Sequence, residues 1–134
     1  MKEVLDMLYD HDAIGYLATV DNGAPQVRPW AFMFEENGRL YFCTSSDKAV
    51  FKQLQANPNV AYSKTNKNMV WLRISGKIVF DDDIKKKEKM LELLPMLVDF
   101  YQSADNPLMQ AFYIEHGTAI IDDYTPEPPK IFTF

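Results

Sequence analysis

Apolar and polar residues follow one another with different periods along the chain, and each change of period marks an expected element. Residues 2–10 carry apolar side chains at helical spacing, which predicts a short amphipathic helix. Three β-rich segments follow at residues 13–20, 26–34 and 39–44, separated by the turn signals Asp21-Asn22-Gly23 and Asn37-Gly38. Strands joined by such tight turns form an antiparallel meander, so the second and third strands are expected to lie side by side.

The helical period returns at residues 46–56, with Ser45 or Ser46 expected to cap the first turn. Six mostly antiparallel strands with helices inserted between them predict a mainly β fold with α additions, a β-barrel in one domain over residues 1–134. Periodicity leaves the topology of this barrel open. The later elements are expected as strands at 59–65 and 70–80, a helix at 84–94, a short helix from Pro95, a strand at 112–124 and a proline-rich tail at 125–134.

Composition and charge narrow the classes of function. The formal net charge of -5 argues against a partner held through its phosphate backbone, so nucleic acid is set aside. No segment approaches the roughly 20 apolar residues of a membrane helix, and the acidic start is unlike a signal peptide. Cys43 stands alone, so neither an internal disulfide nor a cysteine-based metal site is expected. We expect a soluble, cytoplasmic protein without a metal.

Two neighbouring segments carry candidate chemistry for an anion. Pro29 interrupts the second strand, and because proline cannot donate to a ladder, an edge, a bulge or a ligand-facing gap is expected there. The junction Thr44-Ser45-Ser46-Asp47-Lys48 joins a strand to a helix and offers N–H groups, hydroxyls and a lysine. With the second and third strands adjacent, Arg28 would lie near this junction and help to neutralise a phosphate dianion. The alternative is an ordinary cap and a solvated arginine.

A third candidate lies on the polar face of the fifth strand, where Trp71 and Arg73 project together. An aromatic face and a cation suit a flat, anionic ligand. A solvent-facing pair or a subunit contact is the alternative.

These segments together resemble a known family. The run PQVRP (25–29), then GRLYFCTSSDKAVFKQLQANPNVAYS (38–63), then WLRISGKI (71–78) is similar to the pyridoxamine 5'-phosphate oxidase-like FMN-binding split-barrel family. It looks closest to short members of the general stress and nitroimidazole-resistance type, and the resemblance covers about residues 1–125. Its most specific part is the order Arg-Pro, a strand ending in Thr-Ser, then Lys-Ala and a helix ending in Asn-Pro. The resemblance implies a six-stranded antiparallel split β-barrel that forms a homodimer with FMN at the interface.

The resemblance also implies roles for individual residues. Arg28 would hold the FMN phosphate, and Lys48 would complete the phosphate cradle. Trp71 stands where oxidase members carry a glutamine, which implies stacking or shielding in place of a hydrogen bond. Asp47 replaces a basic residue of some members, so a less tightly held phosphate is expected. The remaining implied contacts are Val27, Pro29 and Trp30 with the flavin, and Thr44 and Ser45 with the phosphate or ribityl chain.

The activity implied is that of an FMN-dependent oxidoreductase, which passes electrons from NAD(P)H to a small planar acceptor such as a nitroaromatic or a quinone. The C-terminal Trp- and Arg-containing segment of true pyridoxamine phosphate oxidases is not matched, so vitamin B6 oxidation is not expected. A non-enzymatic flavin-binding or redox- and stress-sensing protein is an open alternative, as is the same fold with haem or a deazaflavin. No catalytic residue is assigned: His11 and His116 are interpreted first as surface or structural histidines, and whether His116 or the tail lies near the flavin stays open.

Overall fold

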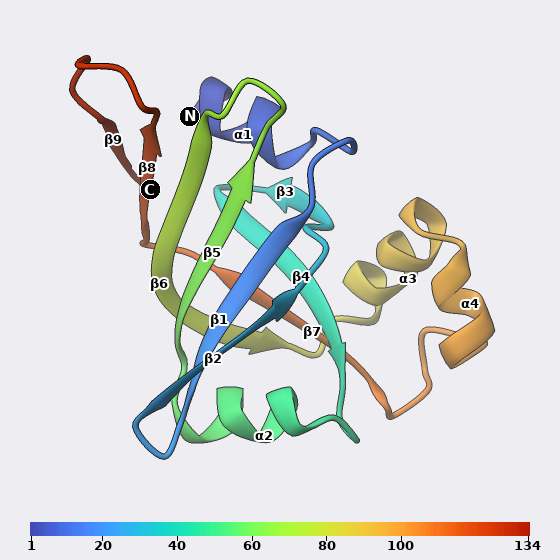
Figure 1. The fold of residues 1–134 in the computed structure, drawn as a ribbon. Helices are drawn as coiled ribbons and strands as arrows, with labels where there is room; N and C mark the ends of the chain where they lie inside the picture. Colours follow the sequence, from blue (N-terminus) through green and yellow to red (C-terminus); the bar gives the residue numbers. More distant parts are fainter.

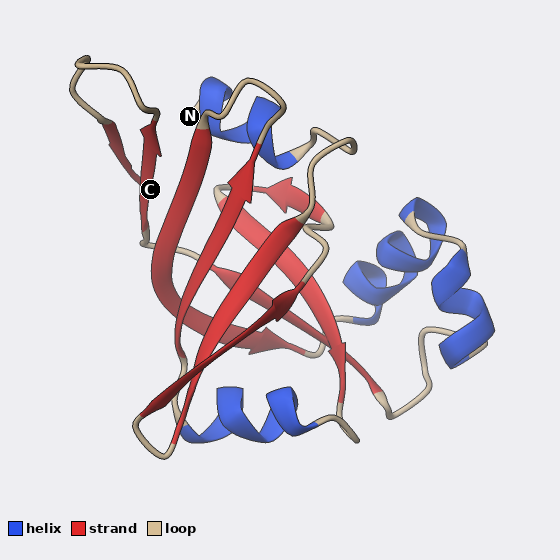
Figure 2. Cartoon of the chain, in the orientation of Figure 1, coloured by secondary structure: helices blue, strands red, loops and turns tan.

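The computed structural model describes residues 1–134, which form nine strands and four helices (Figures 1 and 2). The strands are β1 (Gly15–Asp21), β2 (Ala24–Pro29), β3 (Phe34–Glu36), β4 (Arg39–Ser45), β5 (Asn59–Thr65), β6 (Trp71–Asp81), β7 (Met109–Ile114), β8 (Thr118–Asp122) and β9 (Lys130–Thr133). The helices are α1 (Lys2–Leu8), α2 (Ala49–Ala56), α3 (Ile84–Leu93) and α4 (Met96–Tyr101).

One antiparallel sheet in the order β2-β1-β5-β6-β7-β4-β3 curves into a split barrel, and β8 and β9 extend it from β6. The curvature depends on β6, which pairs with β8 through Trp71–Ser75 and with β7 through Ile78–Asp81. Gly76 lies at the change of partner, where an added Cβ would come within 2.8 Å of Ile114 Cγ2. Only a residue without a side chain allows this close approach.

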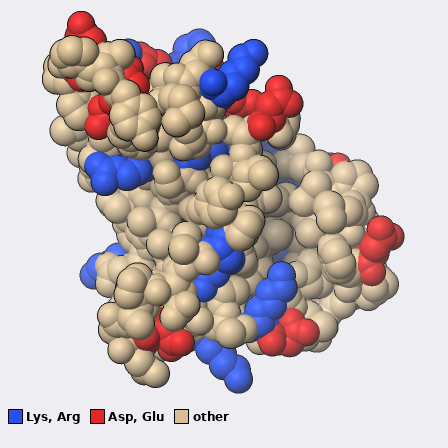
Figure 3. All heavy atoms as spheres, in the orientation of Figure 1, with Lys and Arg blue, Asp and Glu red and all other residues tan.

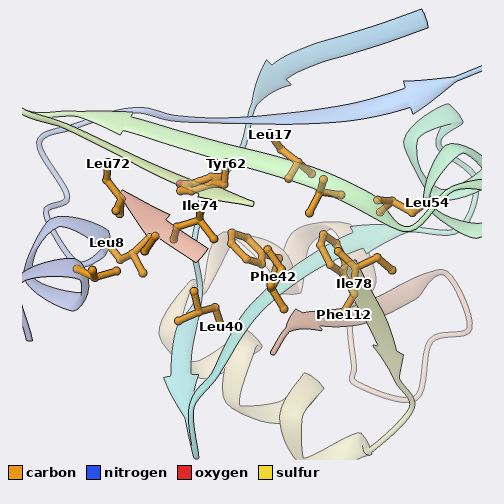
Figure 4. Packing of buried hydrophobic residues seen from close by; sticks show 14 of the residues in the cluster. Leu8, Leu17, Leu40, Phe42, Leu54, Tyr62, Leu72, Ile74, Ile78 and Phe112 are labelled. Atoms are coloured by element: carbon orange, nitrogen blue, oxygen red, sulfur yellow. The ribbon is translucent and has the colours of Figure 1, made fainter. Parts of the chain in front are cut away.

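The barrel interior holds a cluster of 16 buried apolar residues from most of the strands (Figure 4). The helix α1 covers one end of the barrel with Val4 and Leu8, and α2 covers the other with Val50 and Leu54 (Figure 1). A second cluster of nine residues lies outside the barrel, where Met90 of α3 and Leu97 of α4 pack against β4 and β7. Alternation of buried and exposed residues along β1 and β5 follows the period of two expected of strands with one face in a core.

The mainly β split-barrel architecture is confirmed, but two of the six expected strands are each divided. The expected strand at 26–34 is β2 and β3, because the ladder ends at Pro29 and resumes at Phe34. The expected strand at 112–124 is β7 and β8, separated at His116, whose φ of 56° lies in the left-handed region. The tail supplies the ninth strand, and it pairs with β8 of its own chain.

The expected meander is wrong. The strand β2 pairs with β1 alone, and β4 pairs with β3 and β7, so β2 and β4 are not neighbours. The segment between β2 and β3 instead joins the two ends of the strand order. Within it, Trp30 N–H donates to Gly15 O (2.8 Å) and Met33 N–H donates to Tyr41 O (3.0 Å). These two bonds lead the chain from the start of β1 to β4, and β2 remains an edge strand.

The expected cap of α2 is also wrong. The helix begins at Ala49 after Lys48, whose backbone is extended, and no side chain caps it. Ser45 donates its hydroxyl to Asp47 Oδ1 (2.5 Å). Ser46 is held away from the helix because its N–H donates to Leu108 O (2.9 Å). The first N–H groups of α2 therefore lack the side-chain acceptor that usually satisfies them.

Candidate functional site

Arg28 points toward the barrel side of β2, not toward solvent. In the ladder it lies opposite Leu17, which is itself opposite Tyr62, and both of these side chains are buried. Its guanidinium reaches the barrel end that α2 covers: Nη1 donates to Thr19 Oγ1 (2.8 Å) and to Leu17 O (3.2 Å), and Nη2 donates to Gln53 Oε1 (2.9 Å). The edge strand thus places a half-buried arginine against the exposed side of α2.

The charge of Arg28 has no carboxylate partner. All three hydrogen bonds go to neutral oxygens, and no salt bridge involves this residue. A guanidinium has five N–H donors, so two of them, including Nε–H, make no hydrogen bond within the chain. Burial lowers the pKa of Arg28, because removal from water disfavours its charged form. An anion would satisfy both the free donors and the charge.

The junction between β4 and α2 offers further groups for an anion. Thr44 is 1% exposed, and its Oγ1 is the one buried side-chain oxygen without a hydrogen-bond partner. Ser45 is also buried, and its carbonyl accepts from the N–H of Lys48 (3.1 Å). Buried hydroxyls are normally paired, so the unpaired Thr44 oxygen fits a polar ligand group.

Lys48 and Arg28 approach the same side of the molecule. The Lys48 ammonium lies 5.8 Å from the centroid of the Trp30 ring, and Trp30 follows Arg28 by two residues. Gln53, which accepts a hydrogen bond from Arg28, belongs to α2, the helix that follows Lys48. Lys and Arg side chains lie across the middle and lower part of the face in Figure 3, the region where Figure 1 shows β2 and α2. The structure therefore places Arg28 beside α2 and Trp30 near Lys48, which precedes α2 and follows Thr44 and Ser45 in the chain.

The other sequence-predicted residues lie on the opposite face of the sheet. Arg73 shares a row with Pro29 and Tyr16, and Val27 shares the next row with Ala61. These rows face away from the barrel interior, and a shallow hollow of about 240 Å³ there is lined in part by Val27 and Arg73. Within one chain, Arg73 therefore does not approach the Arg28 guanidinium.

Trp71 is half-buried, and its ring packs edge-on against Tyr124 at 4.9 Å. It lies at the start of β6 on the same outward side as Arg73. The joint projection of Trp71 and Arg73 expected from spacing is present, but an intramolecular aromatic contact already covers part of the indole ring.

A second hollow, of about 400 Å³, adjoins Pro29 and Trp30 on the barrel side. Its walls are mostly apolar, and Tyr62 Oη donates to Trp30 O (3.0 Å) beside it. Lys64 also lines this hollow and is 6% exposed, with Nζ donating to Leu8 O (2.7 Å) at the end of α1. Burial lowers the pKa of Lys64. An apolar wall next to Trp30 suits the ring of a planar ligand.

Sequence reasoning missed Thr19, Gln53 and Lys64. Thr19 and Gln53 become site residues only through contacts with Arg28 across 9 and 25 positions, which no local pattern signals. His116 is well exposed at the turn between β7 and β8, where it lines a separate hollow with Lys77 and Glu115. None of the sequence-predicted site residues borders that hollow.

The fold and the topology of the sheet define a split-barrel protein. The chain belongs to the pyridoxamine 5'-phosphate oxidase family, whose family model matches residues 1–117. It is similar to a solved NimC/NimA family protein from Clostridium acetobutylicum, with 34% identity, a TM-score of 0.89, and coverage of 100% of this chain and 92% of that one. It is also 28% identical over 118 residues to General stress protein 26 of Bacillus subtilis (strain 168), covering 85% of this chain and 81% of that protein. The family resemblance found in the sequence is confirmed.

More distant solved structures share the fold alone. They include a FAD-binding protein from Mesorhizobium loti (17% identity, TM-score 0.65, covering 91% of this chain and 94% of that one). A heme binding protein from Mycobacterium smegmatis (13% identity, TM-score 0.72, covering 98% and 57%) and an F420 reductase (24% identity, TM-score 0.57, covering 81% and 89%) also share it. None of the four helices of this chain has the length and apolar character needed to cross a membrane.

Cys43, next to Thr44, provides a test of burial at this junction. Its thiol packs against the second core cluster, and burial raises its pKa to about 11, although the positive charge of Lys48 acts in the opposite direction. Because the folded-state pKa exceeds the value of 9.0 for a free thiol, the folded state keeps its proton between about pH 9 and pH 11, where the unfolded state loses it. The contribution of Cys43 to stability is therefore complete below pH 9 and is lost as the pH rises toward 11.

We expect native protein at pH 9 to react with a thiol-specific disulfide reagent about fiftyfold more slowly than protein unfolded in denaturant, because only the thiolate reacts and about half of the unfolded thiol is ionised at this pH. The chain has one cysteine, so the released chromophore reports this residue alone, and a Cys43→Ala variant gives the blank. Equal rates for native and unfolded protein would contradict the burial of this thiol.

Proposed function

We propose that this protein binds FMN and passes electrons from NAD(P)H to a small planar acceptor. The observation that carries the proposal is the half-buried Arg28 guanidinium, which has two unused donors and only neutral partners. The unpaired hydroxyl of Thr44 and the ammonium of Lys48 lie at the adjoining junction. Free donors, an unpaired hydroxyl and two cations match the chemistry of a phosphate dianion.

In this proposal the protein binds and orients the cofactor, and FMN supplies the redox chemistry when it is bound. Arg28, Lys48, Thr44 and Ser45 hold the phosphate. Trp30 and the apolar hollow beside it provide a surface for the planar ring. Asp47 holds the Ser45 hydroxyl and places a negative charge near the junction, which weakens phosphate binding.

We further propose that the functional unit is a homodimer in the cytoplasm. The outward sheet face carries exposed apolar side chains, with Tyr16 45%, Val27 68% and Ile131 67% exposed. Exposed apolar groups that cluster on one face are typical of a subunit interface. Because Val27 and Arg73 face away from Arg28 within one chain, a second copy would have to bring its outward face to the first chain's phosphate residues for all these groups to serve one cofactor.

A binding or sensing role without turnover is the second candidate. It is favoured by one observation: Arg28, Trp30, Thr44, Ser45 and Lys48 include no carboxyl group or histidine suited to general acid–base catalysis. The carboxylate at the junction, Asp47, is occupied by the Ser45 hydroxyl, and His11 at the edge of the hollow beside Trp30 is exposed.

The visible spectrum of the purified protein separates the candidates. We expect bound FMN, identified by mass after release, that loses its flavin absorbance when NADH or NADPH is added without oxygen. Flavin that stays oxidised with both nucleotides would favour the binding or sensing role. A haem Soret band, or a deazaflavin identified by mass, would replace FMN in the proposal.

Replacing Arg28 by alanine should weaken FMN binding about 10- to 150-fold, because a hydrogen bond to a charged group contributes about 1.5–3 kcal/mol. Titration of apo-protein by quenching of FMN fluorescence measures this loss. Arg39→Ala is the matched control, since Arg39 is also a strand arginine but donates to Glu115 (2.9 Å). Unchanged FMN affinity in Arg28→Ala would remove Arg28 from the phosphate site.

Replacing Ala61 by glutamate should separate the dimer. Ala61 is exposed in the middle of the outward face, where a new carboxylate would be buried on association. We expect the wild type to elute with about twice the chain mass of 15.5 kDa and Ala61→Glu to elute as a monomer, by light scattering after size exclusion. Ala56→Glu introduces the same exposed charge on α2 and should leave the dimer intact. A monomeric wild type would refute the interface.

A further inference from the structure

We infer that Gln53, supported by Thr19, is the positioning residue that keeps Arg28 oriented and its charge available to a phosphate monoester. The inference rests on the proposed function and concerns how its phosphate site achieves preference for the phosphorylated flavin. Neither residue is expected to touch the flavin ring.

The three side chains form a closed hydrogen-bonded triangle. Arg28 donates from Nη1 to Thr19 Oγ1 (2.8 Å) and from Nη2 to Gln53 Oε1 (2.9 Å), and Thr19 Oγ1 donates to Gln53 Oε1 (2.6 Å). Thr19 is 2% exposed, so its hydroxyl has no access to water as an alternative partner. The Leu17 carbonyl adds a third acceptor for Nη1 at 3.2 Å. Both N–H groups of Nη1 and one of Nη2 are therefore occupied.

The direction of each bond in the triangle is determined by chemistry. Arginine only donates, so the Gln53 atom that faces Arg28 must be the carbonyl oxygen. The Thr19 oxygen accepts from Arg28, so its single proton is free to go to Gln53 Oε1. The triangle thus has one stable arrangement, and it leaves Nε–H and one Nη2–H of Arg28 without a partner.

The neutrality of Gln53 is the decisive property. A carboxylate of the same length at this position would form an ion pair with Arg28, and it would also repel a phosphate dianion. The amide orients the guanidinium and leaves its charge uncompensated. Gln53 also lines a hollow of about 530 Å³ beside the turn between β1 and β2, so packing alone does not hold its side chain. The two hydrogen bonds at Oε1 therefore determine where it points.

The test compares FMN with riboflavin, which lacks the phosphate. We expect Gln53→Glu to weaken FMN binding about tenfold or more, the effect of losing one charge-assisted contact, while riboflavin affinity changes less than about twofold. The ratio of the riboflavin dissociation constant to the FMN dissociation constant therefore falls toward one. Fluorescence quenching of each flavin by full-length apo-protein measures both constants. Gln55→Glu is the matched control, because it places the same charge on an exposed position of α2 and should leave the ratio unchanged.

Three further variants keep the inference testable if Gln53→Glu does not fold. Gln53→Met removes the acceptor without adding charge, so a smaller loss of FMN preference is expected. Thr19→Val removes the hydroxyl at nearly constant volume and should also lower the ratio, whereas Thr19→Ser retains the hydroxyl and should restore it. A general loss of folding would not distinguish FMN from riboflavin.

The failures of the two proposals are distinguishable. A wild type that binds neither flavin overturns the proposed function and this inference with it. A wild type that prefers FMN over riboflavin, with the same preference in folded Gln53→Glu or Gln53→Met, overturns the role of Gln53 alone.

Discussion

The rest of the structure depends on the segment from Trp30 to Met33, which joins the two end strands of the sheet, β2 and β3. Pro29 cannot donate to a ladder, and the next N–H groups turn to Gly15 on one side and Tyr41 on the other. Tyr62 closes over this segment by donating to Trp30 O, and Gly15 beneath it has no room for a side chain, since a Cβ would lie 1.8 Å from Tyr62 Oη. As a result β2 is an edge strand, and Arg28 on its inward side contacts Gln53 of α2.

That edge position explains the unusual electrostatics of Arg28. Several other cations of the chain have carboxylate partners: Arg39 binds Glu115, Lys130 binds Glu3, and Lys86 and Lys89 approach Glu36. Arg28 is instead surrounded by a carbonyl, a hydroxyl and an amide. Arg28 shares with the buried Lys64 the property of having only neutral hydrogen-bond partners, but Lys64 donates to the backbone at the end of α1, whereas Arg28 keeps two free donors. The proposed FMN phosphate gives it the anion that the protein itself does not supply.

The sheet separates the candidate residues into two groups. Arg28 points to the inner side and Arg73 to the outer side, because alternate residues of a strand project to opposite faces. Under the proposed function this separation is a reason for association: the inner group of one chain and the outward face of another would together enclose a cofactor that either chain alone leaves open. The orienting triangle of Thr19, Gln53 and Arg28 lies wholly within one chain, so phosphate preference and dimer formation are separate properties of the molecule.

Local patterns in the sequence determined the helices, six strand regions and the order Arg-Pro, Thr-Ser, Lys-Ala on which the family assignment is based. Strand and helix periods indicate which face is buried, and turn residues indicate where the chain reverses. Both signals come from residues close together in the sequence, so the sequence alone predicts these features. The sequence did not determine which strands pair with one another. The turn at Asn37-Gly38 indicated a hairpin, and it joins β3 to β4, but the break at Pro29 kept β2 out of it. The division at His116, the pairing of the tail with β8 and the Thr19–Gln53–Arg28 triangle likewise depend on contacts between distant residues. Such contacts form only when the barrel closes, and tertiary structure alone decided them.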